Sequence, residues 1–417
     1  MEDDSSKLIN SIWSQELDLP PSCVEFCPAH PSYFLVGTYN LQKDDVEPLP
    51  EKKAEDNDDE ANENAQAVKP KKTQSRNGSI LVFRLQGGNS IVPIQAEPQP
   101  SALLDLHFNP NEGFQDICAT VSSTATLAVF KFSPGPEDDK PLKHINTMDI
   151  ASLSGGDISA SEGSEILFLS VCWHPSQADT LAVTTNTGYV YLVHLPAWDK
   201  GWKLHPEPAI THTLEAWTVN LSPNLGITNS SSDVSFRIFS GGDDSKLRFG
   251  TVTWNPSEDF LSETVPAVEA RGHDAGVTAI LPLFFQDDGS EFLVTGSYDE
   301  NIRLFSLVPY GRPKNLVEMG LGGGVWRLKL IDLDKTRNES YHWRARILAS
   351  CMHTGSRVVN VLQTVDGEHQ FRVLGRFEEH KSMNYGSDFH PGRKDKLTVV
   401  STSFYDRLLC LWQLELS

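Results

Sequence analysis

The chain has 417 residues, 39% of them hydrophobic, and a formal net charge of -21 at pH 7. Such an acidic chain disfavours a nucleic-acid-binding surface, and no apolar run approaches the roughly 20 residues that a membrane-spanning helix needs. The opening Met-Glu-Asp-Asp-Ser-Ser lacks the basic and then apolar pattern of a secretion signal. We therefore expect a cytoplasmic protein that binds neither nucleic acid nor a membrane.

Residues 7–19 come first, ahead of any repeated pattern. A closed ring of sheets must join its two ends, because otherwise an edge stays exposed. We predict that this segment forms the outer strand of the last sheet, beside residues 408–414.

Residues 42–76 interrupt the first repeat between its two middle strands. They are rich in Glu, Asp, Asn, Lys and Pro and have almost no aromatic residue, a composition typical of disorder. We predict a disordered acidic insertion, for which a tolerated loop is a simpler explanation than a partner-binding segment.

The repeated unit is clearest at residues 292–307. An apolar strand leads through Gly296 into a polar turn ending at Asp299, and a second apolar strand follows. Six other stretches have this plan, at intervals of about 50 to 60 residues, which is typical of a β-propeller. The last aromatic position of each unit falls at Phe83, Phe130, Val193, Gly250, Phe305, Asn360 and Trp412.

An upstream strand accompanies these hairpins and has its own ending. Five units end it with an apolar residue, one further residue and proline, at Pro28, Pro110, Pro175, Pro223 and Pro391. Proline lacks the amide donor that a central strand needs, so it fits where a strand stops. The other two units have Leu281-Pro282 and Leu330 in this place. The two patterns together predict seven blades.

Gly272-His273 followed by Tyr298-Asp299 resembles a WD repeat. In that family the histidine of the loop leading into a blade contacts the turn aspartate, and here we expect a buried, hydrogen-bonded brace. The predicted fold is an all-β, seven-bladed WD-repeat β-propeller over residues 7–417, with the N-terminal strand closing the last blade.

Six cysteines are scattered along the chain without zinc spacing, since Cys23 and Cys27 have no second pair. We expect reduced, mostly buried thiols, and neither metal nor another cofactor.

Seven motifs in chain order give a closer resemblance. They are Glu215-Ala-Trp217, Ser240-Gly-Gly-Asp-Asp244, Thr295-Gly-Ser-Tyr-Asp-Glu300, Gly323-Gly-Val-Trp-Arg327, Cys351-Met-His-Thr-Gly355, Tyr385-Gly386 and Ser403-Phe-Tyr-Asp406. Together they are similar to the diphthine methylesterase family, the WD-repeat enzymes of diphthamide biosynthesis. The resemblance covers blades four to seven. It implies hydrolysis of the methyl ester of methylated diphthine on translation elongation factor 2, the expected partner of a monomeric enzyme.

These motifs fall in loops leading into blades or in turns after the second strand, which open on one face of a WD propeller. We expect aromatic and acidic side chains there to bind the trimethylammonium group of diphthine. The predicted substrate-binding residues are Glu215, Trp217, Tyr298, Trp326, Tyr385, Tyr405 and Asp406. Packing within the blades is the alternative for each aromatic residue.

Ester hydrolysis needs a base or nucleophile and a group that stabilises an oxyanion. We expect His353 to be the base, because it stands beside the turn and an imidazole side chain suits the activation of water. Arg327, or backbone amides of residues 322–324, would stabilise the oxyanion. Cys351 is the alternative nucleophile, although a buried strand cysteine is the simpler interpretation. No Gly-x-Ser-x-Gly elbow is present. A non-enzymatic WD scaffold that recruits partners through the same face is the alternative function.

Overall fold

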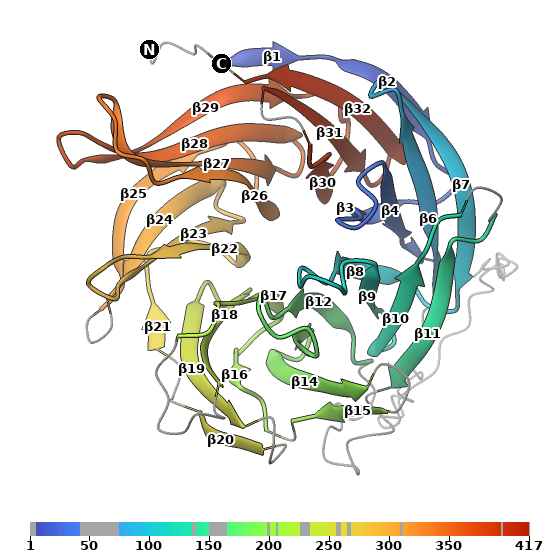
Figure 1. The fold of residues 1–417 in the computed structure, drawn as a ribbon, viewed down its shortest axis with the longest axis horizontal. Helices are drawn as coiled ribbons and strands as arrows, with labels where there is room; N and C mark the ends of the chain where they lie inside the picture. The colour runs from blue at the N-terminus through green and yellow to red at the C-terminus, as the bar shows by residue number, and fades with distance from the viewer. Residues whose placement is uncertain are drawn as a thin grey trace, which may run out of the picture.

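A computed structural model describes residues 6–41, 75–135, 139–149, 165–197, 201–205, 207–225, 234–255, 260–264, 268–308, 312–392 and 395–416. These residues form strands, turns and loops without a helix. Seven sheets stand in a ring around a central axis (Figure 1), so the predicted seven-bladed propeller is confirmed. Within the described ranges no helix is long and apolar enough to cross a membrane.

Blades one to three follow one another along the chain. Blade one consists of β3 (Pro21–Phe26), β4 (Tyr33–Thr38), β6 (Arg76–Gln86) and β7 (Ser90–Gln99), with the short β5 (Asn40–Leu41) beside β6. Blade two consists of β8 (Leu103–Phe108), β9 (Ile117–Ser122), β10 (Thr126–Phe132) and β11 (Leu142–Asp149). Blade three consists of β12 (Phe168–Trp173), β13 (Thr180–Thr185), β14 (Tyr189–Ala197) and β15 (Gly201–Leu204), with β16 (Ile210–Thr211) also beside β14.

Blades four and five continue the ring. Blade four consists of β17 (Ala216–Leu221), β18 (Val234–Gly242), β19 (Leu247–Asn255) and β20 (Phe260–Thr264), with β21 (Val268–Ala270) also beside β19. Blade five consists of β22 (Val277–Phe285), β23 (Glu291–Ser297), β24 (Asn301–Leu307) and β25 (Lys314–Gly320).

The last two blades each take a strand from the N-terminus. Blade six consists of β26 (Arg327–Asp334), β27 (Tyr341–Ser350), β28 (Ser356–Thr364), β29 (His369–Phe377) and β1 (Lys7–Ile9). Blade seven consists of β30 (Gly386–Phe389), β31 (Lys396–Ser403), β32 (Leu408–Glu415) and β2 (Ser11–Glu16).

The N-terminal segment closes the ring as predicted, because β2 runs antiparallel to β32, with Ser11 opposite Trp412. The segment also forms a second strand, which was not predicted. Residues 7–9 form β1, which lies parallel to β29 at the edge of blade six. One segment therefore joins two neighbouring blades, and Figure 1 shows both chain ends on this side of the ring.

The innermost strands end where their proline motifs predict. β3, β8, β12, β17 and β30 each stop two residues before the proline. Blades five and six differ, because β22 continues through Pro282 by a shift in register next to that residue.

The predicted insertion, residues 42–76, lies almost wholly outside the described residues. The chain on either side of it is held together, because Asn40 pairs with Asn77 and Leu41 with Arg76. Arg76 is itself the first residue of β6, so the end of the segment belongs to the hairpin.

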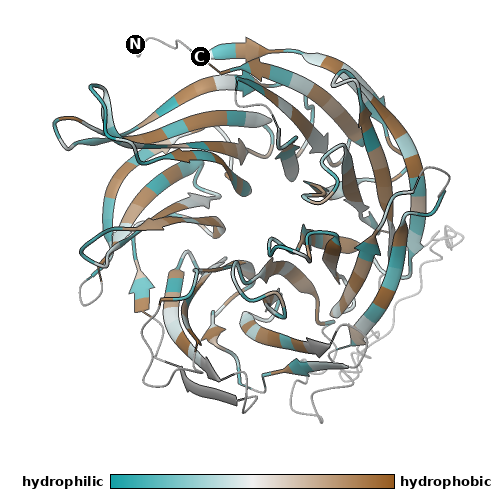
Figure 2. Cartoon of the chain, viewed as in Figure 1, coloured by the Kyte–Doolittle hydropathy of each residue, from teal (hydrophilic) through white to brown (hydrophobic). Residues whose placement is uncertain are grey.

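Hydrophobic clusters fill the spaces between neighbouring blades, and brown and teal alternate along the strands of Figure 2. Phe305 faces blade four, and Trp412 faces blade six, where it stacks on Phe377 at 5.3 Å between ring centroids. In blade six this position belongs to Val359, which packs towards blade five, and not to Asn360. The predicted alignment was wrong there by one residue, which places a side chain on the opposite face of its sheet.

Candidate functional site

Aromatic side chains from three neighbouring blades meet on one face of the ring. Trp217 lies 5.6 Å from Trp326 and 6.1 Å from Tyr298 between ring centroids, and Tyr298 lies 5.9 Å from Trp326. Tyr385, from a fourth blade, extends the group at 5.0 Å from Trp326. We call Trp217, Tyr298, Trp326 and Tyr385 the aromatic cluster.

The local fold explains why these four rings meet. Trp217 lies at a register shift near the start of β17, and Trp326 and Tyr385 immediately precede β26 and β30. Tyr298 follows β23, in the turn of blade five. The loops leading into blades and the turns after second strands thus share one face, as predicted, and each ring of the cluster is half-buried.

Two carboxylates accompany the aromatic cluster. The indole N–H of Trp217 donates to Asp243 Oδ1 at 3.0 Å. Burial raises the pKa of Tyr298 above its usual range, and the nearby Tyr385, Asp243 and Glu215 raise it further. Glu215 is therefore close enough to act electrostatically on the cluster, and the surroundings of the four rings are acidic.

Tyr405 and Asp406 lie at the outer edge of the cluster. Tyr405 is 72% exposed, and the Phe404 ring contacts both tyrosines, at 5.0 Å from Tyr405 and 5.5 Å from Tyr385. Burial raises the pKa of Tyr385, and Tyr405 raises it further. Asp406 Oδ2 accepts the backbone N–H of Lys381 at 3.1 Å, which is the contact of a turn brace.

The predicted histidine–aspartate contact of blade five is absent. His273 bonds through Nε2 to Thr295 at 2.9 Å, and Asp299 instead accepts the N–H of Asp274 and pairs with Arg303 at 2.8 Å. The buried brace itself is present, with other partners.

Blade four contains the direct contact, which the sequence did not reveal. His212 Nδ1 lies 2.9 Å from Asp244 Oδ1, and His212 Nε2 lies 3.0 Å from Ser240 Oγ. Thr211-His212-Thr213 lacks the glycine that draws attention to Gly272-His273.

His353 and Arg327, the two predicted catalytic residues, lie in different surroundings. His353 is exposed, on the turn between β27 and β28, beside Met352, which bridges to Asn384 next to Tyr385. Arg327 is the first residue of β26, directly after Trp326, and it pairs with Asp105 of blade two through two contacts of 2.9 and 3.1 Å. Arg327 therefore connects the aromatic cluster to the centre of the ring.

The innermost strands place an ionic network behind Arg327. Asp105 is 1% exposed and also accepts the Ser170 hydroxyl at 3.0 Å and the Val171 N–H at 3.1 Å. His107 Nε2 lies 3.4 Å from Asp105 Oδ1, and His107 Nδ1 lies 2.9 Å from Glu25 Oε2. Arg327 and His107 thus flank one carboxylate.

Lys329 continues the network on the other side of Glu25. Its Nζ lies 3.1 Å from Glu25 Oε1 and 2.7 Å from Asp388 Oδ1. Asp388 Oδ2 accepts the N–H of Phe26 at 2.6 Å. The six residues of this channel network are Glu25, Asp105, His107, Arg327, Lys329 and Asp388.

Proximity of opposite charges sets the ionisation of the channel network. Burial lowers the pKa of His107, but the carboxylates of Asp105 and Glu25 outweigh this effect and raise it to about 10. Burial raises the pKa of Glu25, but Lys329 and His107 lower it to about 2. Both groups are therefore charged at neutral pH, and His107 is a proton donor there.

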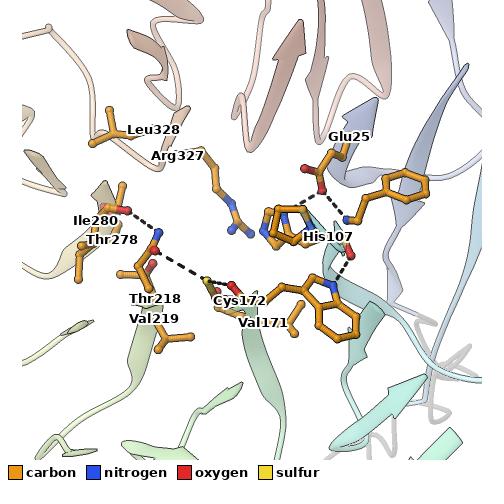
Figure 3. A pocket seen from close by; sticks show the side chains of 16 residues that line it. Glu25, His107, Val171, Cys172, Thr218, Val219, Thr278, Ile280, Arg327 and Leu328 are labelled. Atoms are coloured by element: carbon orange, nitrogen blue, oxygen red, sulfur yellow. Dashed lines mark hydrogen bonds and ion pairs between the residues drawn. The ribbon is translucent and has the colours of Figure 1, made fainter. Parts of the chain in front are cut away.

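A cavity of about 230 Å³ adjoins the network. Figure 3 shows Arg327, His107 and Glu25 turned towards one another on one side, with Thr218, Cys172 and Ile280 opposite. Of the six residues of the channel network, only Arg327 was predicted from the sequence as a site residue. The signal for its carboxylates was an acidic residue within an apolar inner strand, at Glu25, Asp105 and Asp388.

The cysteines support neither a thiolate nor a metal site in the described structure. All six are free, and five are buried. Burial raises the pKa of Cys351 to about 12, with Arg357 opposing it, so this thiol stays protonated at neutral pH. Across the described ranges no group of His, Cys, Asp and Glu side chains has the arrangement of a metal site.

Named proteins are similar to this chain over nearly its whole length. "Diphthine methyltransferase" of Saccharomyces cerevisiae is 25% identical, over 98% of this chain and 98% of that protein. The Dictyostelium discoideum "Diphthine methyltransferase homolog" is 26% identical, over 95% and 97%. The Homo sapiens protein named "Diphthine methyltransferase" is 23% identical, over 90% and 73%.

The chain was also compared with protein-family models and with solved structures. No protein-family model matches it. The solved structure of Saccharomyces cerevisiae Sqt1 is similar, with a TM-score of 0.51 and 11% identity over 98% of this chain and 100% of that one, a likeness that concerns the fold alone. The chain is therefore similar, over nearly its whole length, to several relatives that share the name diphthine methyltransferase.

Proposed function

We propose that the protein hydrolyses the carboxyl-methyl ester of methylated diphthine on translation elongation factor 2. The observation that carries this proposal is the aromatic cluster, which lies directly before Arg327 and the channel network. The names of the relatives support a place in diphthamide biosynthesis.

The aromatic cluster suits the trimethylammonium group of diphthine. A quaternary ammonium ion is attracted to aromatic faces, by about 0.5 to 2 kcal/mol each. Asp243 and Glu215 add negative charge beside the rings. We propose that Trp217, Tyr298, Trp326 and Tyr385 hold the cation, and that Tyr405 and Asp406 belong to the outer edge of the same surface.

The channel side of the site suits the ester. In hydrolysis, water attacks the carbonyl carbon, the carbonyl oxygen becomes an oxyanion, and the bond to the methoxy oxygen breaks to release methanol and a carboxylic acid. Arg327 is proposed to stabilise the oxyanion. His107, charged and beside it, is a proton donor for the departing methoxide. His353 is proposed as the base that takes a proton from water.

This electrostatic arrangement favours ester removal over ester formation. Hydrolysis develops negative charge on oxygen, which Arg327 and His107 stabilise. Methyl transfer to a carboxylate neutralises charge instead, so cations that hold the carboxylate would slow that reaction.

The direct test is release of methanol from methyl-esterified elongation factor 2 by the purified protein. Arg327→Met should lower kcat by about 100- to 1000-fold, the usual cost of losing one oxyanion donor. Arg271→Gln, on the exposed surface of another blade, is the matched control. If wild-type protein binds the substrate but releases no methanol, the scaffold function replaces this proposal.

A further inference from the structure

Blade six presents a row of polar side chains to blade seven. Arg346 on β27 stands opposite Asn360 on β28, and Asn360 stands opposite Arg372 on β29. Residues directly opposite in a sheet share a face. On this same face, Leu348 and Val358 pack against Leu397 and Trp412 of blade seven, so the row lies at the junction of the two blades.

A cavity of about 340 Å³ opens on this row. Lys7 of β1 joins Arg346, Asn360 and Arg372 in its wall, and Leu414 and Leu416 lie on the side of blade seven. Three cations thus line one cavity in a chain whose formal net charge is -21. This cavity is distinct from the one beside the channel network, with which it shares no lining residue.

The polar groups of the row are incompletely satisfied. Arg346 is 5% exposed, and its NH1 donates to Asp332 at 3.0 Å, but its buried Nε has no hydrogen-bond partner. The buried Oδ1 of Asn360 also has none. Within the described residues, Lys7 and Arg372 make neither an ion pair nor a hydrogen bond through their side chains. Buried polar groups rarely stay unpaired.

Blade four provides an internal comparison. Arg237 on β18 is equivalent to Arg346 on β27. Gly250 and Val359 hold the same position in their blades, and they stand opposite Ile238 and Ile347. Each arginine immediately precedes that isoleucine. Arg237 pairs at 2.9 Å with Glu291, a buried carboxylate of the next blade. The residue of blade seven that corresponds to Glu291 is Leu397. Glu291 lies two residues before Leu293, the partner of Phe305, and Leu397 lies two residues before Val399, the partner of Trp412.

Nearby acids do not replace the missing carboxylate. Asp332 is shared between Arg346 and Arg344. Glu415, in the cavity wall, pairs with Lys396 at 3.5 Å and is 64% exposed through its side chain. The cavity between blades six and seven therefore keeps an excess of positive charge. At the junction of blades four and five, by contrast, the carboxylate of Glu291 neutralises Arg237.

We propose that this junction binds a phosphate-sized oxyanion. Its oxygens would accept from Arg346, Arg372 and Lys7, whose guanidinium and ammonium donors suit such a ligand. A protonated phosphate oxygen would donate to Asn360 Oδ1. Inorganic phosphate and a phosphate monoester share this chemistry.

The experiment is thermal unfolding of the whole protein in increasing inorganic phosphate, at an ionic strength held constant with chloride. Arg372→Gln and Lys7→Gln change exposed side chains and leave the buried Arg346 in place. Each should weaken the apparent phosphate affinity roughly tenfold, the loss of one charge-assisted contact. Arg271→Gln, an exposed arginine elsewhere, should retain the wild-type affinity.

The control separates specific binding from the general stabilisation of proteins by phosphate. If all variants respond to phosphate as wild type does, or wild type responds no more than to chloride, the proposal is wrong. Tighter binding of acetate than of phosphate would also overturn it, in favour of a carboxylate ligand. Phenyl phosphate binding more tightly than inorganic phosphate would support the site and identify a monoester as the better ligand.

Discussion

The pair of Asp105 and Arg327 gives a quantitative test of how the channel is held. Asp105→Asn keeps the size of the side chain but removes the charge that Arg327 meets at 2.9 and 3.1 Å. Breaking a buried ion pair costs about 3 to 5 kcal/mol. Because Arg327 adjoins the cavity and its side chain is 24% exposed, water can reach it, and we expect about 3 kcal/mol.

A double-mutant cycle isolates the interaction. Arg327→Met leaves Asp105 with the charged His107, the Ser170 hydroxyl and the Val171 N–H, so it should destabilise less, by about 2 kcal/mol. The double variant should cost about 2 kcal/mol less than the sum of the single changes. Urea unfolding measures all four free energies. A coupling below about 0.5 kcal/mol would refute the claim that these residues form one unit.

Three further predictions concern the cluster, the proposed base and acid stability. Trp217→Ala and Trp326→Ala should each raise KM about 2- to 30-fold, because each removes one aromatic face from the bound cation. Tyr189→Ala, the control, should leave KM unchanged. If steady-state assays give the wild-type KM for both tryptophan variants, the aromatic cluster does not bind the cation. His353→Ala should lower kcat about 100-fold or more and leave KM nearly constant; a normal kcat would exclude it as the base. Burial lowers the pKa of His380 to about 4, although the nearby carboxylates of Asp406 and Glu379 act to raise it. The unfolded chain, with a pKa near 6.5, therefore binds more protons between these values, and stability should fall by up to about 3 kcal/mol as pH drops through this window. His380→Gln should flatten that decline in urea unfolding curves, and an unaltered slope would show that other groups cause it.

The repeat architecture was readable from the sequence because its signals are local. Proline motifs such as Phe108-Asn-Pro110 mark strand ends, and the turn at Asp299 marks a hairpin. The position of Asn360 was misassigned because its strand, Ser356–Thr364, alternates apolar and polar residues weakly. Only packing against a neighbouring blade decides which face of such a strand is buried.

The aromatic cluster could be predicted because propeller geometry brings equivalent loops to one face. The channel network could not, because Asp105 and Arg327 are separated by 222 positions in the chain. Each charged residue alone looks like an exception in an apolar strand, and their pairing depends on closure of the ring. The parallel strand β1 escaped prediction for the same reason, since its partner β29 lies at the other end of the sequence.

The most direct measurement of the central claim is hydrolysis of methyl-esterified elongation factor 2 in water enriched in oxygen-18, followed by mass spectrometry of the modified peptide and of methanol. Attack of water at the carbonyl carbon predicts loss of the ester methyl, one oxygen-18 in the new carboxylate and unlabelled methanol. Persistence of the ester, or label in methanol instead of the carboxylate, would contradict the proposed reaction.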